Sequence, residues 1–458
     1  MRALVISNLH APDCTGGYEM VASECLDALE RDHGWQITCH CARTGRPAPF
    51  APNNRKSKIE NRKSSYPSRV HPDLTGYFPR GWTHHHALLP AARHLARTPQ
   101  IVETLTRESR EAGATLLFNP RRLSTLQWLP AMAAARNPVA WVSDYWPIEY
   151  PDCDKLWQAA QANRLSWSPL VMLGAARVRK QYATGRKLAS DDDAGNTELA
   201  ECRWRSEPLG GRREAPPQSA KKNLGAPSHP DLACIKRAAF VSEHIMRKTA
   251  HAFPSLEEAI VIHNGIDPAL FPYAPMTPDR WRTWGFCGRI QPEKGVLQAL
   301  DLFARAAATR PGLRFLIAGD MTTSHGAEVR QKIATTPILA CRVDCLGPIP
   351  RERLAEKFYH RAGVLLFTSQ WDEPYALTLL EAMSTGTHVV ATPTGGTPEI
   401  ITPETGTLLP TALPSENFNL NFQLKLQLAN ARAFAAQRTI ARMAERIADF
   451  ACRQNRLR

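Results

Sequence analysis

Two carboxylates, Glu373 and Glu381, stand with seven residues between them in the run QWDEPYALTLLEAMSTGTHVVATPTGGTPE, residues 370–399. Carboxylates accept hydrogen bonds from hydroxyl groups, and a helical rise of about 1.5 Å per residue would separate these two by about 12 Å. That separation suits the two ends of one long ligand better than one reacting bond. The spacing therefore favours a ligand such as a nucleotide sugar, with Glu373 accepting hydrogen bonds from the sugar hydroxyls and Glu381 from the ribose.

The elements around these carboxylates follow from the pattern of apolar residues and turn formers. Residues 363–367, GVLLF, predict a short buried parallel strand, and the loop after it leads into a helix. Proline suits the first turn of a helix and pushes the preceding residue out of the helical conformation, so Pro374 should open the helix and Glu373 should lie just outside it. The helix should end near Gly386, and a second strand should follow at residues 388–391. Anions bind at such helix N-termini, beyond the strand ends, so we expect a diphosphate there.

Two basic residues lie in a second unit of the same kind, WGFCGRIQPEKGV at residues 284–296. A short apolar strand is followed by Gly288 and Arg289, and Lys294 precedes the next expected helix. The planar fork of Arg289 can bind phosphate oxygens in pairs, and Lys294 can add a mobile point charge. Either cation alone is most simply a solvated loop residue, but next to the carboxylate unit both are predicted to bind the diphosphate.

These motifs together resemble the donor half of the retaining family-4 glycosyltransferases, the glycosyl transferases group 1, which have the GT-B fold. The resemblance is close over residues 288–410 and looser over most of the rest of the chain. The motifs that carry it, besides the two carboxylates, are GRIQPEKG at 288–295, FLIAGD at 315–320, GGTPE at 395–399 and VIHNGIDPALF at 261–271.

The resemblance implies an α/β protein with two Rossmann-like domains facing across a cleft. It implies sugar transfer from a nucleoside diphosphate sugar, with retention at the anomeric carbon and with neither a metal nor a cofactor besides the donor. Glu373 would orient the sugar, while Arg289 and Lys294 would bind the diphosphate and stabilise the leaving-group charge on a front-side path. The other donor-site residues that we predict are Gly288, Tyr375, Ala376, Leu377, Glu381 and Glu399.

Two segments depart from the family pattern. Where the family usually has Phe-Gly-Leu after Glu-Pro, this chain has Tyr375, Ala376 and Leu377, so the backbone must approach a phosphate without glycine. Ala376 is small, and we expect it to be tolerated. The segment AWVSDYWP resembles a family segment that often carries His before Asp, but here Ser143 precedes Asp144. Asp144 is expected to bind substrate, whereas Ser143 argues against a histidine contact to the donor sugar.

A glycine loop follows the first expected strand at residues 2–7. Gly16 and Gly17 come next, and an amphipathic helix is predicted from about Glu19. Glycines would let the backbone approach a leaving phosphate or an acceptor, although most such pairs are only turns. Because the place of this pair matches the glycine loop of the family, we predict that both glycines bind substrate.

The expected elements divide the chain into three parts. Residues 1–235 should form an N-terminal acceptor-binding Rossmann-like domain, with irregular insertions near 43–70 and 185–230. Residues 236–425 should form the C-terminal domain that binds the nucleotide-sugar donor. Residues 426–458 show apolar residues at helical spacing and should pack back towards the N-terminal domain.

The chain of 458 residues carries a net charge of +14, with 57 Lys and Arg against 43 Asp and Glu. Much of the excess lies at residues 43–65, where NRKS recurs without the interleaved aromatics of a single-strand-binding groove. No nucleic-acid partner is therefore expected, while a peripheral contact with the anionic inner face of a membrane stays open. The sequence has neither a secretory signal nor an apolar run of 18 residues, so a cytoplasmic location is expected.

No metal site is expected. Adjacent histidines on an extended segment point in different directions, the aspartate pairs stand on turns or in irregular sequence, and the eleven cysteines contain no CxxC pair. Reduced thiols are expected. The candidate ligands are Cys39, Cys41, His84, His85, His86, Asp152, Asp154, Asp191, Asp192, Asp193, Cys341 and Cys345.

The sequence thus predicts a retaining, metal-independent glycosyltransferase acting on a glycan, a lipid-linked or a small-molecule acceptor. Synthesis of a cell-surface polysaccharide, a glycolipid or another glycoconjugate is the expected setting, and a UDP-sugar is the hypothesis for the donor. Three alternatives stay open. They are a hydrolase, whose acid and base would need to lie about 5–9.5 Å apart, a catalytically impaired GT-B scaffold, and a basic protein that binds nucleic acid or a membrane surface.

Overall fold

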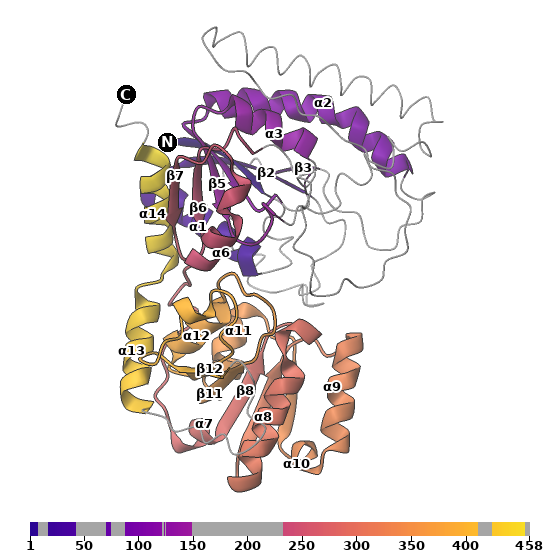
Figure 1. The fold of residues 1–458 in the computed structure, drawn as a ribbon, viewed down its shortest axis with the longest axis vertical. Helices are drawn as coiled ribbons and strands as arrows, with labels where there is room; N and C mark the ends of the chain where they lie inside the picture. The colour runs from indigo at the N-terminus through magenta and orange to yellow at the C-terminus, as the bar shows by residue number, and fades with distance from the viewer. Residues whose placement is uncertain are drawn as a thin grey trace, which may run out of the picture.

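Two parallel β-sheets, each covered by helices, make up this computed structural model (Figure 1). The structure describes residues 1–7, 17–42, 70–74, 88–120, 123, 125–148, 232–410 and 424–453. The two sheets occupy separate lobes, one above the other in Figure 1.

The first sheet has the strand order β3-β2-β1-β4-β5-β6-β7, and all its pairings are parallel. Helix α2 packs against α3, and the second half of the chain reaches this lobe again through α14, which packs against α1. The strands are β1 (Arg2–Ser7), β2 (Gln36–Ala42), β3 (Val70–Leu74), β4 (Ala114–Phe118), β5 (Pro138–Val142), β6 (Arg237–Phe240) and β7 (Glu258–Val261). The helices are α1 (Gly17–His33), α2 (Leu88–Glu111), α3 (Thr125–Ala134), α6 (Glu243–Thr249) and the short η2 (Ala250–Ala252).

The expected boundary at residue 235 is wrong. Strands β6 and β7 lie beyond it in the sequence, yet β6 pairs with β5 and β7 pairs with β6 in the first sheet. The apolar side chains of β6 are fully buried there because the strand lies between two neighbours. The first domain therefore extends to about Ile262, and the connection to the second domain follows it.

The second sheet has the order β10-β9-β8-β11-β12-β13, again all parallel. Numbered from its own first strand, this is the 3-2-1-4-5-6 order of a Rossmann fold, which the first sheet shares and extends by β7. The strands are β8 (Thr283–Cys287), β9 (Arg314–Ala318), β10 (Val343–Gly347), β11 (Val364–Phe367), β12 (His388–Ala391) and β13 (Thr407–Leu408). The helices are α7 (Pro278–Arg282), η3 (Pro292–Lys294), α8 (Val296–Thr309), α9 (Ser324–Thr335), α10 (Pro337–Ala340), α11 (Arg351–Leu354), η4 (Ala355–Tyr359), α12 (Leu377–Thr385) and η5 (Thr397–Glu399).

The central strands are apolar along their whole length because helices cover both faces of a parallel sheet. All four residues of β11 are buried, as the run GVLLF predicts, and so are all four residues of β12. The predicted α/β class and the two Rossmann-like domains are confirmed.

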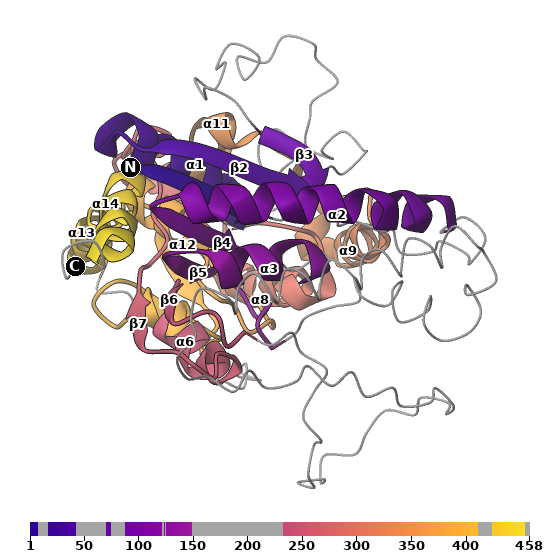
Figure 2. The same cartoon turned by 90° about the horizontal axis from the view of Figure 1, so that it is seen from above.

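Two C-terminal helices return the chain to the first lobe (Figure 1). Helix α13 (Leu424–Ala436) packs against α12 and β12 of the second domain, and α14 (Ile440–Cys452) packs against α1 of the first. Between them, Thr439 forms a β-bridge with Ile266 in the other segment that connects the domains. The expected return of the C-terminal helix is confirmed, but it begins at Ile440 rather than at residue 426. Figure 2, viewed from above, shows both helices along one side of the molecule.

Buried groups fix α14 to the first sheet. Arg237 lies 4% exposed at the start of β6, and its guanidinium donates to the Phe450 carbonyl and, at 3.0 Å, to the Asn137 side chain. The Asn137 amide donates to the Ala451 carbonyl at 2.6 Å. Two carbonyls in the last turn of α14 are thereby satisfied by side chains of the first domain.

One buried histidine in the second sheet should make stability depend on pH. Burial at the start of β12 lowers the pKa of His388 from 6.5 to about 4. Below pH 6.5, His388 binds a proton in the unfolded chain but stays neutral in the folded protein until the pH nears 4. The free energy of unfolding therefore falls as the pH drops from 6.5 towards 4. The loss from this group is at most about 3 kcal/mol.

Urea unfolding between pH 7 and pH 4 measures this contribution. We expect the His388→Gln variant, which cannot titrate, to lose less stability over that interval than the wild type. Equal losses in the two proteins would contradict the assignment to His388.

Candidate functional site

The candidate site lies at the carboxyl ends of β8 and β11, the two neighbouring strands between which the strand order of the second sheet reverses. Gly288 and Arg289 follow β8, and Glu373 follows β11 after a short loop. Open α/β sheets bind ligands at this point because two loops diverge there and leave a crevice. The motifs that the sequence singled out therefore meet at one place.

A buried ion pair joins the two loops. Lys294 Nζ lies 2.7 Å from Glu373 Oε1, and the Ser369 hydroxyl donates to the same oxygen at 2.6 Å. The side chain of Glu373 is 4% exposed, that of Lys294 is 16% exposed, and the ammonium also lies 4.6 Å from the centre of the Trp371 ring. Burial lowers the pKa of Lys294, although the Glu373 carboxylate opposes the shift. Lys294 and Ser369 thus fix the direction of the Glu373 carboxylate.

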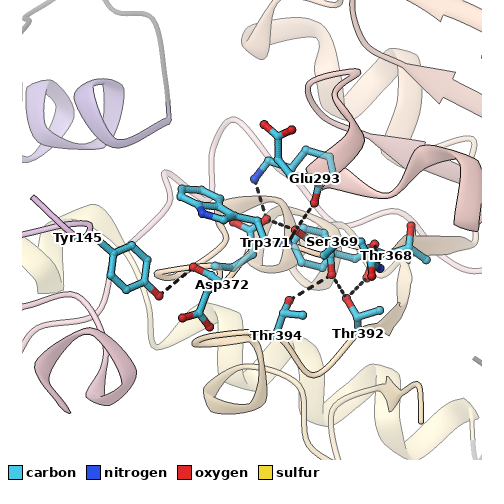
Figure 3. A network of polar contacts seen from close by, with 12 residues as sticks. Tyr145, Glu293, Thr368, Ser369, Trp371, Asp372, Thr392 and Thr394 are labelled. Atoms are coloured by element: carbon cyan, nitrogen blue, oxygen red, sulfur yellow. Dashed lines mark hydrogen bonds and ion pairs between the residues drawn. The ribbon is translucent and has the colours of Figure 1, made fainter. Parts of the chain in front are cut away.

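Backbone contacts hold the loop that carries Lys294 against the loop that carries Glu373 (Figure 3). The Glu293 carbonyl accepts hydrogen bonds from the backbone N–H groups of Gln370, at 2.8 Å, and Trp371, at 3.1 Å. Gly295 has φ +73°, and a Cβ there would lie 1.8 Å from the Thr368 carbonyl oxygen. Only glycine permits this close approach, which brings Lys294 to the carboxylate.

Arg289 is exposed beside this pair. No side-chain hydrogen bond or ion pair engages its guanidinium within the described residues, yet its charge acts on Lys294 and on Tyr18. A guanidinium that the fold does not use is available for an anionic ligand.

The segment before α12 differs from the prediction. The helix begins at Leu377, with Ala376 as its N-cap, and Pro374 is not its first residue. The reason lies in a remote turn: Gly395, at φ +57°, packs so closely that a Cβ would lie 2.2 Å from the Glu373 carbonyl oxygen. Gly396 N–H donates to that oxygen at 2.6 Å, so the chain stays extended up to Ala376. The predicted end of the helix at Gly386, with φ +79°, is confirmed.

Two of the residues predicted to bind the donor at the start of α12 have buried side chains. The Tyr375 side chain is fully buried, its hydroxyl accepts a hydrogen bond from Arg438 at 3.1 Å, and its ring stacks on His263. Ala376, the N-cap of α12, is buried as well, at 8% exposed.

Glu381 lies in different surroundings from Glu373. One carboxylate oxygen accepts from the Tyr359 hydroxyl at 2.9 Å, and the other lies 3.4 Å from Arg351 Nε. Arg351 also forms an ion pair with Glu24 of α1, so it joins Glu381 to the first domain. Binding of a ribose by Glu381 stays a prediction, and a ribose would have to share this carboxylate with protein donors.

The prediction that Glu399 binds substrate is not supported by its contacts. Its two oxygens accept hydrogen bonds from the backbone N–H groups of Glu243, at 2.9 Å, and His244, at 2.8 Å, at the N-terminus of α6. His263 lies 3.4 Å away as a further partner. Burial alone would raise the pKa of Glu399, but these hydrogen bonds hold it below its usual value, so the carboxylate is an ionised cap between the domains.

The sequence also predicts site residues in the first domain. Gly16 lies outside the described residues, and Gly17 begins α1, where an added Cβ would lie 3.1 Å from Leu377 Cδ1. Asp144 is 5% exposed, and one of its oxygens accepts from Trp146 N–H at 2.9 Å. Ser143, at the position where the family often has histidine, is buried, and its hydroxyl has no partner among the described residues.

Three residues near the candidate site are not predicted from the sequence. Ser369 orients Glu373, Arg351 pairs with Glu381, and Tyr18 of α1 places its hydroxyl near Glu373. The sequence feature that could have indicated Tyr18 is its position directly after the Gly16–Gly17 pair. Arg351 follows the carboxyl end of β10, where a basic residue is a candidate ligand of an anion.

A second interdomain contact adjoins the site (Figure 3). The Tyr145 hydroxyl donates to the Asp372 carbonyl at 3.0 Å and lies 2.8 Å from His244 Nε2. His244 in turn lies 3.1 Å from the Asp372 carboxylate. The residue that precedes Glu373 is thus held by two side chains of the first domain.

Among the described residues, no group of three or more His, Cys, Asp and Glu side chains is placed to hold a metal ion. The candidates at residues 84–86, 152–154 and 191–193 lie outside those residues. Cys341 and Cys345 are exposed free thiols. No helix in the described part of the chain is long and apolar enough to cross a membrane.

Part of the second half of the chain is similar to a known protein family. Residues 278–432 match the model of the glycosyl transferases group 1 family. The matched region contains Arg289, Lys294, Glu373 and Glu381.

Curated relatives match over the same part of the chain. The D-inositol 3-phosphate glycosyltransferase of Mycobacteroides abscessus is 40% identical over 129 residues, 28% of this chain and 28% of that protein. Glycogen synthase of Mycobacterium tuberculosis is 34% identical over 158 residues, 33% of this chain and 36% of that protein. The chain thus aligns with about a third of the length of these glycosyltransferase relatives.

Solved structures match over nearly the whole chain. Anabaena HepE in complex with UDP and glucose has a TM-score of 0.56 at 18% identity and covers 98% of both chains. The lipopolysaccharide outer core galactosyltransferase WaaB has a TM-score of 0.53 at 14% identity, with 98% of this chain and 99% of that chain covered. These likenesses show the fold, which is GT-B, with two Rossmann-like domains.

Proposed function

We propose that this protein is a retaining, metal-independent glycosyltransferase that moves a sugar from a nucleoside diphosphate sugar to a hydroxyl acceptor. The observation that carries the proposal is the arrangement at the ends of β8 and β11. There Arg289, whose side chain has no hydrogen-bond or ion-pair partner in the described part of the chain, lies near the buried Lys294–Glu373 pair, and α12 begins shortly after Glu373. The family match of residues 278–432 supports it.

The donor would lie along this crevice with its diphosphate between Arg289, Lys294 and the N-terminus of α12. Two cations and a helix N-terminus supply the charge that a divalent metal would otherwise provide. Glu373, fixed by Lys294 and Ser369, would accept hydrogen bonds from the sugar hydroxyls and hold the anomeric carbon next to the leaving oxygen.

Retention follows a front-side path in this proposal. A double displacement would need a free carboxylate on the far face of the sugar, but Asp144 already accepts a hydrogen bond from the Trp146 backbone, and Glu373 is paired with Lys294. On the front-side path, the departing phosphate oxygen accepts the proton of the acceptor hydroxyl as the new bond forms. Arg289 and Lys294 then stabilise the charge on the leaving group.

The first domain would bind the acceptor, a glycan, a lipid-linked or a small molecule, in the synthesis of a surface polysaccharide, a glycolipid or another glycoconjugate. Names of relatives, which include a Salmonella lipopolysaccharide 1,2-N-acetylglucosaminetransferase, support this range of acceptors. We propose a UDP-sugar as donor, since HepE was solved with UDP and with UDP-glucose. A cytoplasmic protein with a peripheral contact to the inner membrane face fits such acceptors.

A thermal-shift panel of UDP, GDP and ADP in the presence of EDTA tests the donor site. We expect UDP to raise the melting temperature, because a ligand at 100 times its dissociation constant stabilises the folded state by about 2.7 kcal/mol. Stabilisation by GDP or ADP alone would replace the UDP assignment. Stabilisation that appears only when a divalent metal replaces EDTA would overturn the metal-free site.

A further inference from the structure

The Tyr145 hydroxyl reaches from the first domain to the loop that carries Glu373 (Figure 3). Tyr145 lies shortly after β5 and is 4% exposed, and its hydroxyl donates to the Asp372 carbonyl at 3.0 Å. Asp372 belongs to the loop that follows β11 of the second sheet. A side chain of the first domain is therefore hydrogen-bonded to the backbone one residue before Glu373.

This hydrogen bond acts on the peptide unit that leads into Glu373. The Asp372 carbonyl and the Glu373 N–H lie in one planar peptide group, so a donor that fixes the carbonyl also constrains the backbone from which the Glu373 side chain departs. On the other side of the residue, the Gly396 N–H donates to the Glu373 carbonyl at 2.6 Å. The backbone of Glu373 is thus held from both sides, once by each domain.

The residues just before Asp372 are held within the second domain. The Glu293 carbonyl accepts hydrogen bonds from the N–H groups of Gln370 and Trp371, and this contact joins two loops of the same sheet. The next backbone contact along the chain is the one that Tyr145 supplies. Support of the loop therefore passes from the second domain to the first immediately before Glu373.

His244 aligns the Tyr145 hydroxyl. A phenol has one proton, which is donated here to the Asp372 carbonyl, so the phenol oxygen accepts from His244 Nε2, 2.8 Å away. The Asp372 carboxylate lies 3.1 Å from the same nitrogen. Because both neighbours are acceptors, Nε2 carries a proton in the neutral ring as well as in the charged one. The backbone N–H of His244 donates to Glu399 of the second domain at 2.8 Å, which anchors this residue in turn.

We propose that Tyr145, aligned by His244, is a positioning residue for sugar transfer, because its hydroxyl fixes the peptide unit that sets the direction of the Glu373 carboxylate. This inference rests on the proposed function, in which Glu373 orients the donor sugar. Tyr145 acts through the backbone rather than by contact with the sugar. A displacement of about 1 Å in an orienting group can slow a reaction by about 10²-fold, so this contact matters for the rate.

The proposal separates donor binding from transfer. Arg289 and Lys294, which are assigned to the diphosphate, belong to the second domain. The direction of Glu373, by contrast, is completed by the first domain through Tyr145. The affinity for UDP should therefore depend little on Tyr145, whereas the rate of transfer should depend on it.

Tyr145→Phe tests the contact, because it removes the hydroxyl and keeps the ring. We expect the kcat of transfer from a UDP-sugar to fall by about 10-fold, as for the loss of one positioning hydrogen bond, while the UDP dissociation constant from calorimetry changes by less than about 3-fold. The matched control is Tyr273→Phe, which removes a hydroxyl from an exposed tyrosine and should equal the wild type in both measurements.

His244→Gln and His244→Leu test the alignment. The glutamine amide can donate to the same two acceptors and should keep most of the rate, whereas leucine cannot donate and should lower kcat as Tyr145→Phe does. Melting temperatures of all variants show whether each remains folded. Equal rates in the two His244 variants overturn the alignment by His244.

The outcomes separate the positioning role from the proposed function. A wild type that binds no nucleoside diphosphate and transfers no sugar refutes the proposed function, and the positioning role falls with it. Transfer by the wild type with an unchanged kcat in Tyr145→Phe overturns the positioning role alone. A parallel loss of UDP affinity and kcat also overturns it, because a general loosening of the domain contact would affect both.

Discussion

Replacing Arg289 with alanine should lower the transfer rate by about 10²-fold or more, because a charged donor aimed at the leaving group is lost. The stability of the folded state should change little. Arg289 is exposed, and no hydrogen bond or ion pair of its side chain contributes to the described fold. The measurement is the initial rate of transfer from the donor identified in the nucleotide panel, combined with a melting temperature.

Arg282→Ala provides a matched control. Arg282 is an exposed arginine immediately before β8, at the opposite end of the strand from Arg289. Its removal changes the net charge equally and should leave the rate unchanged. Arg289→Lys should recover only part of the rate, since an ammonium does not bind two oxygens of a phosphate in the way a guanidinium does. A rate near that of the wild type in Arg289→Ala would refute the role in leaving-group stabilisation.

Replacing Lys294 with alanine should damage both catalysis and stability. Glu373 would keep a buried charge without its cation, and removing one partner of a buried ion pair costs about 3–5 kcal/mol. The rate should also fall by about 10²-fold or more, because the same ammonium is assigned to the diphosphate. Urea unfolding and initial rates measure the two effects separately.

The double variant Lys294→Ala/Glu373→Gln distinguishes the two roles of Lys294. A neutral amide in place of the carboxylate should restore much of the lost stability, because no unpaired charge then remains buried. Activity should stay low, since the diphosphate cation and the sugar-orienting carboxylate are both absent. If the double variant is no more stable than Lys294→Ala, the stability loss does not come from the unpaired Glu373.

Three contacts between the domains adjoin the candidate site, and each uses a charged group. Glu399 caps α6, Asp372 lies against His244, and Arg351 links Glu381 to Glu24. Because Asp372 directly precedes Glu373, a movement of the first domain would also shift the Glu373 carboxylate. The interdomain contacts thereby make the geometry of the site dependent on the relative position of the two domains.

The sequence by itself determined the local elements of the second domain and the side chains that meet at their ends. The apolar run GVLLF is long enough for a buried strand and too short for a helix, and Gly386 terminates α12 as predicted. Arg289 and Glu373 converge because each follows a strand, and parallel strands place their carboxyl ends at one edge of the sheet. The sequence predicts that Lys294 and Glu373 share a site, and the two side chains form an ion pair there.

Only the tertiary structure decided features that depend on remote partners. The start of α12 moves from Pro374 to Leu377 because the Gly395–Gly396 turn holds the preceding residues extended. β6 joins the first sheet because it pairs with β5, a choice that composition does not reveal. Glu399 becomes a cap because α6 lies against it, and Gly17 at the start of α1 packs close to Leu377 of α12. In each case local propensity leaves several conformations open, and packing against a segment distant in sequence selects one of them.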